Sequence, residues 1–157
     1  MEKLQNISYN INEDNMKILI STLKQKKQII ELGGGIENIE KQHKKGKMTA
    51  RERLASIFDK DSDIIEIGSF AANDLYDEYG GCPCAGVIVM IGIIHERNCI
   101  VVANDSTVKS GAWFPMTAKK NLRAQEISIN TNTPIIYLVD SAGVFLPLQS
   151  EVFADKN

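Results

Sequence analysis

The spacing of apolar residues divides the chain into helical and extended stretches. Over residues 16–32 apolar side chains recur every three or four positions, which predicts a helix with an apolar face. Three glycines at 33–35 end this helix, because glycine readily adopts the left-handed conformation found beyond helix C-termini. The polar stretch 1–15 is predicted to be frayed. The pattern therefore predicts a helical N-terminal extension over residues 1–32 and a separate domain over residues 33–157.

Two short helices are predicted next. Residues 36–44 form a highly charged helical stretch that Gly46 ends. Thr49 and Glu52 have the spacing of a capping box, in which each side chain bonds to the other residue's backbone amide. The helix that follows over residues 50–58 is expected to bury three apolar side chains, Leu54, Ile57 and Phe58.

Extended stretches occupy the middle of the chain. Weak alternation at 63–67 predicts a short strand. Apolar runs at 86–94 and 99–103, separated by four polar residues, predict a β-hairpin with His95 at its tip. The unusually polar stretch between this hairpin and Pro115 is expected to form a loop.

A further helix and strand complete the pattern. Residues 116–130 are predicted to be helical, with Leu122 and Ile129 among the buried side chains. The run 135–139 is apolar and rich in β-branched residues, which predicts a strand buried on both faces. The order strand, hairpin, loop, helix, strand predicts a ββα unit in a layered α/β core.

Composition narrows the class of protein. The 157 residues are 43% hydrophobic and 24% charged, which is typical of a soluble globular chain. A net charge of −2 gives no electrostatic footprint for nucleic acid, and no apolar run is long enough to span a membrane. Three cysteines without a secretory signal indicate a reducing compartment. Residues 151–157 show no closing helix or strand, which predicts a fragment of a longer protein.

Few side chains point to chemistry. The basic run 43–47 is interpreted either as a solvated face or as an anchor for a phosphate group. Cys82 and Cys84 offer too few ligands for zinc and are expected to be structural or incidental, and no metal site is expected. Neither histidine lies in a context typical of a catalytic base, and no phosphate-binding loop or dinucleotide fingerprint is present.

The turn after the last strand is the strongest candidate site. Small residues at 140–143 follow an apolar strand, and ligands bind at such strand ends in α/β sheets. No nucleophile elbow surrounds Ser141, and Asp140 is interpreted either as a base or as a residue that fixes its own turn. Backbone amides remain, and they can hold an oxyanion. The candidate donors are the N–H groups of Ala142, Gly143 and Val144.

Four motifs occur in one order and together resemble a known family. They are Lys47-Met-Thr-Ala-Arg-Glu-Arg53, Ala103-Asn-Asp-Ser-Thr-Val-Lys-Ser-Gly111, Lys119-Lys-Asn-Leu-Arg-Ala-Gln-Glu126 and Ile136-Tyr-Leu-Val-Asp-Ser-Ala-Gly143. The chain resembles the carboxyltransferase (β) subunit of biotin-dependent acyl-CoA carboxylases, most closely the 3-methylcrotonyl-CoA type of leucine catabolism. The likeness covers about residues 33–155.

This resemblance implies a crotonase-like ββα superhelix, here incomplete, with residues 33–157 as part of the N-terminal carboxyltransferase domain. It implies transfer of a carboxyl group from carboxybiotin to an acyl-CoA through an enolate, with the proton taken by the biotin nitrogen. It places the enolate oxygen at the amides of residues 142–144. The candidate contacts for CoA phosphates are Lys109, Lys119, Lys120 and Arg123, with a structural role as the alternative for these residues.

The resemblance also implies partners and a location. Biotin would be carried by a biotin carboxylase and carrier (α) subunit, and other β subunits would complete the active site. A bacterial-type cytoplasmic location is expected, with the mitochondrial matrix as the alternative. The chain departs from the family at Ala142 and Ser110, where glycine is usual, at Val144, where alanine is usual, and at Leu148, where arginine is usual.

Two other functions remain open from the sequence. One is another crotonase-fold reaction on an acyl-CoA, such as hydration or decarboxylation. The other is a non-catalytic CoA-binding or assembly fragment.

Overall fold

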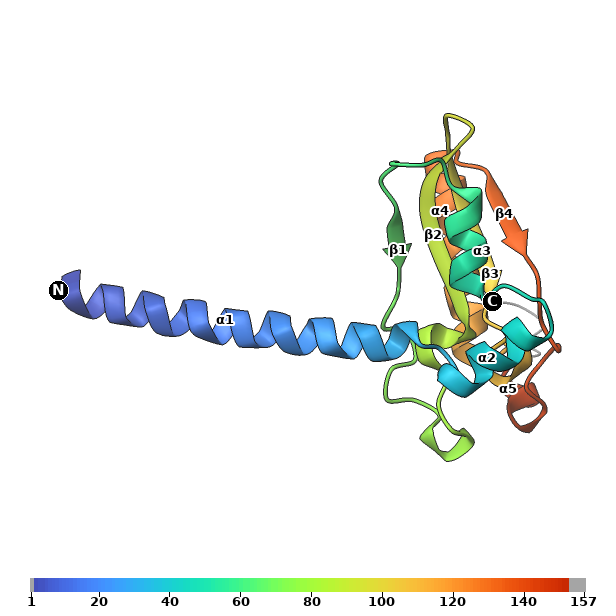
Figure 1. Cartoon of the computed structure of the whole chain (residues 1–157), viewed down its shortest axis with the longest axis horizontal. Helices are drawn as coiled ribbons and strands as arrows, with labels where there is room; N and C mark the ends of the chain where they lie inside the picture. The colour runs from blue at the N-terminus through green and yellow to red at the C-terminus, as the bar shows by residue number, and fades with distance from the viewer. Residues whose placement is uncertain (1, 153–157) are drawn as a thin grey trace.

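The computed structural model describes residues 2–152, with side chains described from residue 9 onward. Five helices and four strands make up this part of the chain (Figure 1). In chain order they are α1 (Glu2–Glu31), α2 (Ile36–Lys44), α3 (Ala50–Ile57), β1 (Ile65–Ile67), β2 (Val87–Ile94), β3 (Arg97–Asn104), α4 (Pro115–Thr131), β4 (Ile135–Leu138) and α5 (Gln149–Val152).

The four strands form one mixed sheet in the order β1-β2-β3-β4. The pairs β1–β2 and β2–β3 are antiparallel, whereas β4 lies parallel to β3 after the α4 crossover. The predicted ββα order is therefore confirmed. The hairpin turn is tighter than expected, with only His95 and Glu96 between the strands, and both have positive φ angles of 47° and 64°. Such a turn matches the twist of paired strands.

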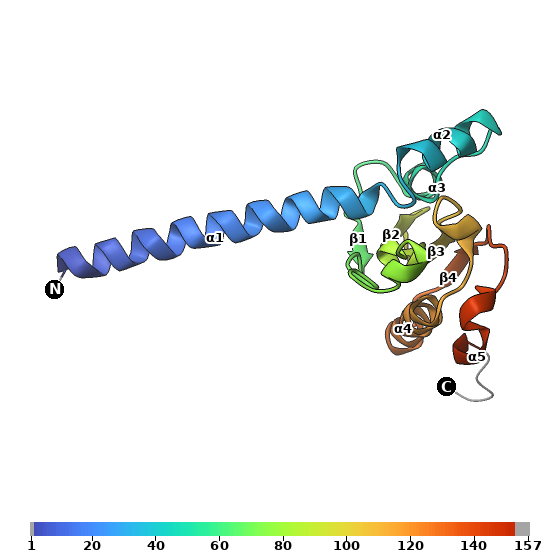
Figure 2. The ribbon, with the colours of Figure 1, turned by 90° about the horizontal axis from the view of Figure 1, so that it is seen from below.

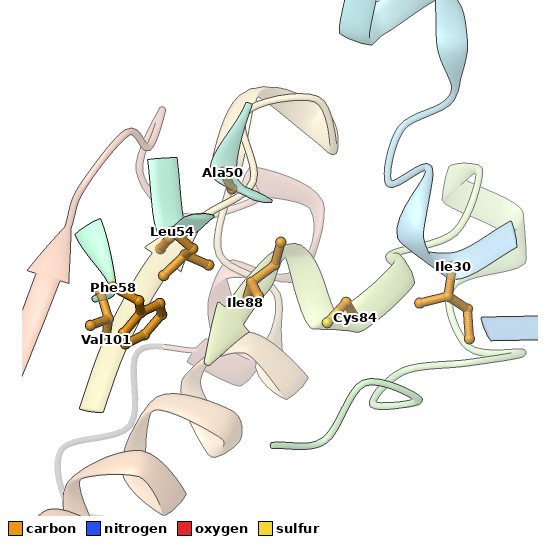
Figure 3. Close-up of a cluster of buried hydrophobic side chains, with 8 residues drawn as sticks. Ile30, Ala50, Leu54, Phe58, Cys84, Ile88 and Val101 are labelled. Atoms are coloured by element: carbon orange, nitrogen blue, oxygen red, sulfur yellow. The ribbon is translucent and has the colours of Figure 1, made fainter. Parts of the chain in front are cut away.

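Helices cover both faces of the sheet (Figure 2). On one face Leu54 and Phe58 pack against Ile88 and Val101, as Figure 3 shows. On the other face Ala124 of α4 joins a cluster formed by alternate residues of the central strands, Val87, Val89, Ile100 and Val102. This alternation explains why the hairpin strands are apolar throughout, because each of their faces is covered.

Helix α1 is longer than predicted and projects from the domain (Figure 1). It begins at Glu2, so the prediction of a frayed stretch 1–15 is wrong for residues 2–15. Ile30 anchors its C-terminal end in the core, and most of its other apolar side chains are exposed. No helix in residues 2–152 is long and apolar enough to cross a membrane.

Two burial predictions are wrong. β4 is an edge strand of the described sheet and is not buried on both faces, with Tyr137 40% exposed. In α4, Ile129 is 74% exposed and Leu122 is also exposed. This helix instead buries Thr117, Lys120, Asn121 and Ala124, because these residues lie on one face at helical spacing.

The last described residues are helical, although no helix or strand was predicted there. Most of the stretch 151–157, where no closing element was expected, lies outside the described residues. Glu151 and Val152 belong to the short helix α5.

Candidate functional site

The loops that follow β3 and β4 meet at one end of the sheet. The two strands are parallel, so their C-terminal ends lie at the same edge. The N–H of Trp113 donates to the Gly143 carbonyl at 2.8 Å, and the N–H of Phe145 donates to the Trp113 carbonyl at 2.9 Å. These bonds form a parallel bridge that fixes the turn 140–144 against the preceding loop.

A left-handed turn at residues 109–111 packs directly against the turn at residues 140–144. Lys109, Ser110 and Gly111 have successive φ angles of 46°, 56° and 72°. A Cβ atom on Gly111 would stand 2.1 Å from the Asp140 carbonyl oxygen. The absent side chain of Gly111 is thus what lets the two turns approach.

The three candidate amides differ in their availability. The Ala142 N–H donates to the Ser110 carbonyl at 3.0 Å, and is therefore used inside the fold. The Gly143 N–H donates to the hydroxyl of the half-buried Ser141 at 3.1 Å, a contact that a ligand oxygen could replace. For the Val144 N–H, residues 2–152 provide no hydrogen-bond partner. The geometry therefore leaves Gly143 and Val144 as the open donors, whereas the sequence suggested three.

Side chains of α3 and of the segment before it bind the ends of β3 and β4 and the turn after β4. The Lys47 ammonium lies 3.3 Å from a carboxylate oxygen of Asp140. Arg53 donates to the Leu138 carbonyl at 3.3 Å and to the Asn104 carbonyl at 2.8 Å, so it joins the ends of β3 and β4. Neither residue was assigned this role from the sequence. Both residues lie in the motif Lys47-Met-Thr-Ala-Arg-Glu-Arg53, and this was the signal that could have indicated such a role.

Aromatic rings fix the chain just after the turn. The ring of Phe145 stacks on the fully buried Phe114 with a centroid separation of 4.2 Å. Its other neighbour is Tyr79, at 5.3 Å and nearly perpendicular. Packing of this kind restrains the position of Phe145 and therefore of the adjacent Val144 amide.

The four predicted phosphate contacts do not form one cluster. Lys109 lines a hollow beside the left-handed turn, whereas Lys119 and Arg123 lie exposed on α4. The Arg123 guanidinium pairs with Glu126. Lys120 is only 6% exposed, and its ammonium donates to the Cys84 carbonyl, the Cys84 sulfur and the Val87 carbonyl at 2.9, 3.0 and 2.7 Å. This geometry does not fit a phosphate contact for Lys120, because its three N–H donors are used internally.

Half-buried Arg51 and Glu66 and buried Lys120 connect α3, β1 and α4 through Cys84. Arg51 forms a bidentate pair with Glu66 at 2.9 and 3.0 Å, and Glu66 lies 3.4 Å from the Cys84 sulfur. Burial opposes ionisation of Glu66, but the hydrogen bonds and charge of Arg51 outweigh it and lower the pKa of this carboxyl.

The thiols fit the structural role expected from the sequence. Burial raises the pKa of the Cys84 thiol and raises that of Cys82 to about 12. Such thiols stay protonated at neutral pH and react slowly. Within residues 2–152, no three His, Cys, Asp or Glu side chains gather in a way that would hold a metal ion.

Comparison with known proteins decides the family. Residues 41–157 match the family described as the carboxyl transferase domain. The chain belongs to this family. The four motifs quoted from the sequence lie within the matched range, so the resemblance to carboxyltransferase subunits is confirmed.

Relatives of this carboxyltransferase chain include methylcrotonoyl-CoA carboxylase β chains. The one from Dictyostelium discoideum is 45% identical over 148 residues, which cover 92% of this chain and 25% of the relative. A biotin-dependent 3-methylcrotonyl-coenzyme A carboxylase β1 subunit from Mycobacterium tuberculosis is 44% identical over 144 residues, covering 91% and 27%. The chain thus spans about a quarter of the length of these relatives.

Solved structures confirm the predicted fold. The β subunit of geranyl-CoA carboxylase from P. aeruginosa matches with a TM-score of 0.79 and 29% identity, over 89% of this chain and 26% of that one. Transcarboxylase 12S, crystallised with methylmalonyl-coenzyme A and methylmalonic acid, matches with a TM-score of 0.78 and 31% identity, over 87% and 27%. The α/β arrangement is therefore that of the crotonase-like carboxyltransferases.

Proposed function

We propose that the chain forms part of a carboxyltransferase that moves a carboxyl group from carboxybiotin onto an acyl-CoA of the 3-methylcrotonyl type. The observation that carries this proposal is the pair of open backbone donors at Gly143 and Val144, placed at a strand end in a member of the carboxyl transferase family. The names of several relatives support the acyl-CoA type.

The turn would act on the thioester oxygen of the substrate. As the enolate forms, negative charge develops on that oxygen, and the amides of Gly143 and Val144 would donate to it. A Cβ atom on Gly143 would meet nothing within 4 Å, so the turn is open to a ligand. Ala142 would contribute indirectly, because its own amide fixes the turn to Ser110.

The chain's residues would bind and orient the acyl-CoA but would not remove its proton. The carboxylate nearest the turn, Asp140, is paired with Lys47. Carboxybiotin held by a partner subunit would supply the carboxyl group and, after CO₂ release, a basic nitrogen. Lys109 remains the proposed CoA phosphate contact nearest the turn, and Lys119 and Arg123 would contact phosphates only from the exposed side of α4.

Partners and location follow the same reasoning. We propose a biotin-carrying α subunit and further β subunits as partners, since a related transcarboxylase 12S structure describes a hexamer assembly. Mitochondrial and bacterial proteins both occur among the relatives. We propose the bacterial-type cytoplasmic location.

The test is complementation. The chain would be combined with the remaining part of a β subunit and a biotinylated partner, and incorporation of labelled bicarbonate into 3-methylcrotonyl-CoA would be measured with ATP present. ATP-dependent incorporation is expected. Failure to carboxylate any short branched acyl-CoA, in an assembly that forms, would reject the proposal.

Decarboxylation is the second candidate. A methylmalonyl-CoA decarboxylase α subunit from Propionigenium modestum is 38% identical over 127 residues. The same assembly would be supplied with methylmalonyl-CoA, and loss of CO₂ without ATP turnover would favour this reaction. Binding of CoA with neither reaction would favour a non-catalytic CoA-binding fragment.

A further inference from the structure

Arg53 lies where β3 and β4 separate. The last paired residues of these parallel strands are Ala103 and Leu138. Beyond them β3 continues into the loop before α4, and β4 continues into the turn 140–144. The Arg53 Nη1 donates to the Leu138 carbonyl at 3.3 Å, and its Nη2 donates to the Asn104 carbonyl at 2.8 Å. One side chain therefore binds both strand ends at the point where their backbone pairing stops.

Helix α3 gives Arg53 a rigid base. The next residue, Leu54, is fully buried in the core cluster that contains Val101 and Ala103 of β3. The capping box of Thr49 fixes the start of the helix. Arg53 is half-buried, and no carboxylate pairs with it within residues 9–152. Its guanidinium therefore serves the two strand-end carbonyls rather than an ion pair.

Internal hydrogen bonds make the loop after β3 follow the position of Asn104. The Asp105 carboxylate accepts from the amide and from the hydroxyl of Thr107, at 3.0 and 2.6 Å. Further along this loop, the Ser110 carbonyl accepts from the Ala142 amide at 3.0 Å. A displacement that begins at the Asn104 carbonyl would therefore reach the turn 140–144.

We propose that Arg53 is a positioning residue for the open backbone donors at Gly143 and Val144. It sets the distance between the two loops where they leave the sheet, while the bridge between Trp113 and Val144 joins them further out. A guanidinium holds its N–H donors in a planar, fixed fork, so it also fixes the spacing of the two carbonyls. A lysine ammonium is a point charge on a flexible stem and cannot impose that spacing. The action of the two donors on a substrate oxygen rests on the proposed function.

Arg51 provides a matched comparison on the same helix. It is also half-buried and also donates through both terminal nitrogens, at 3.0 and 2.9 Å, but to the Glu66 carboxylate of β1. Replacement of either arginine by lysine removes a two-pronged contact of α3. Only Arg53→Lys would release the ends of β3 and β4, so the comparison separates positioning from a general loss of stability.

The first measurement is amide hydrogen exchange on the full chain, followed by NMR. The reporters are the amides of Ala142 and Trp113, which form hydrogen bonds of 3.0 and 2.8 Å between the two loops. Arg53→Lys should raise their exchange rates at least about tenfold, since one hydrogen bond to a charged group changes an equilibrium constant by about this factor. Arg51→Lys should leave these rates within about twofold. Arg53→Gln, a second variant without the fork, should raise them as well, and circular dichroism checks that each variant folds.

The second measurement is the rate of carboxyl transfer in the complemented assembly. Arg53→Lys should lower kcat about tenfold, which is less than the roughly 10²–10³ that loss of one oxyanion donor costs, because the donors are displaced but present. The KM for the acyl-CoA should stay within about twofold, since a positioning residue makes no contact with the ligand. Arg51→Lys should change neither constant by more than about twofold.

Unchanged exchange of the two reporter amides in Arg53→Lys, or an equal rise in Arg51→Lys, would overturn the proposal. A raised KM with an unchanged kcat would also overturn it, because Arg53 would then be a ligand contact. If the reporter amides respond only to the Arg53 variants but the wild-type assembly transfers no carboxyl group, the proposed function fails while the positioning of the turn by Arg53 stands.

Discussion

Gly111→Ala is the substitution most sensitive to the geometry of the candidate site. Gly111 has φ +72°, and a Cβ atom there would stand 2.1 Å from the Asp140 carbonyl oxygen and 3.1 Å from the Ser141 Cα. Both neighbours are backbone atoms, so no side chain can rotate away. The turn 140–144 would have to separate from the left-handed turn that supports it.

The expected cost is a sum of three terms. A left-handed alanine costs about 1 kcal/mol relative to glycine. Overpacking at a rigid contact costs about 1–3 kcal/mol. Separation of the turns also breaks the 3.0 Å bond from Ala142 to Ser110, a contribution of about 1 kcal/mol. The free energy of unfolding should therefore fall by about 3–5 kcal/mol.

Gly46→Ala is the matched control. Gly46 has φ +70° but an added Cβ would meet nothing within 4 Å, so only the conformational cost of about 1 kcal/mol applies. Urea unfolding followed by circular dichroism would give both free energies. In the amide NMR spectrum, Gly111→Ala should also shift the signals of Gly143 and Val144. Equal losses in the two variants would refute the role given to Gly111.

Three further predictions concern other parts of the structure. Ser110→Gly should raise the free energy of unfolding by about 0.5–1 kcal/mol, because Ser110 has φ +56°, and a loss in urea unfolding would contradict this. The lowered pKa of Glu66 means that its ion pair with Arg51 adds stability above its unfolded pKa of about 4.5, and this contribution disappears as the pH falls through the folded pKa. The Glu66→Gln variant should therefore have a lower free energy of unfolding at neutral pH, and that free energy should fall less on acidification than it does in the wild-type chain. An unchanged dependence of the free energy of unfolding on pH would argue against the contribution of this pair. A thiol reagent at neutral pH should modify the buried cysteines, Cys82, Cys84 and Cys99, only after unfolding, and rapid labelling of the native chain would contradict their burial.

Local features of the sequence determined much of the fold. The glycines at 33–35, the capping box at Thr49 and the polar break at His95 each act within a few residues, and the element boundaries at these three places were predicted closely. The turn at residues 142–144 was selected as a candidate site from sequence, because small residues after an apolar strand indicate exposed backbone. The family motifs added the proposed reaction class, which composition and spacing alone left open.

Contacts between distant residues decided the rest. In α4 the apolar residues lie on several sides, so only packing against the sheet determines that Lys120 is buried and Ile129 exposed. The amide of Ala142 is used by Ser110, thirty-two positions earlier in the chain, which no local pattern indicates. The same holds for Lys45 and Lys109, which line one hollow only because α2 packs beside the loop after β3. The sequence therefore determined which segments form helices, strands and turns, because those preferences are local. The tertiary structure decided which donors and charges remain available to a ligand, because that depends on what lies opposite each group.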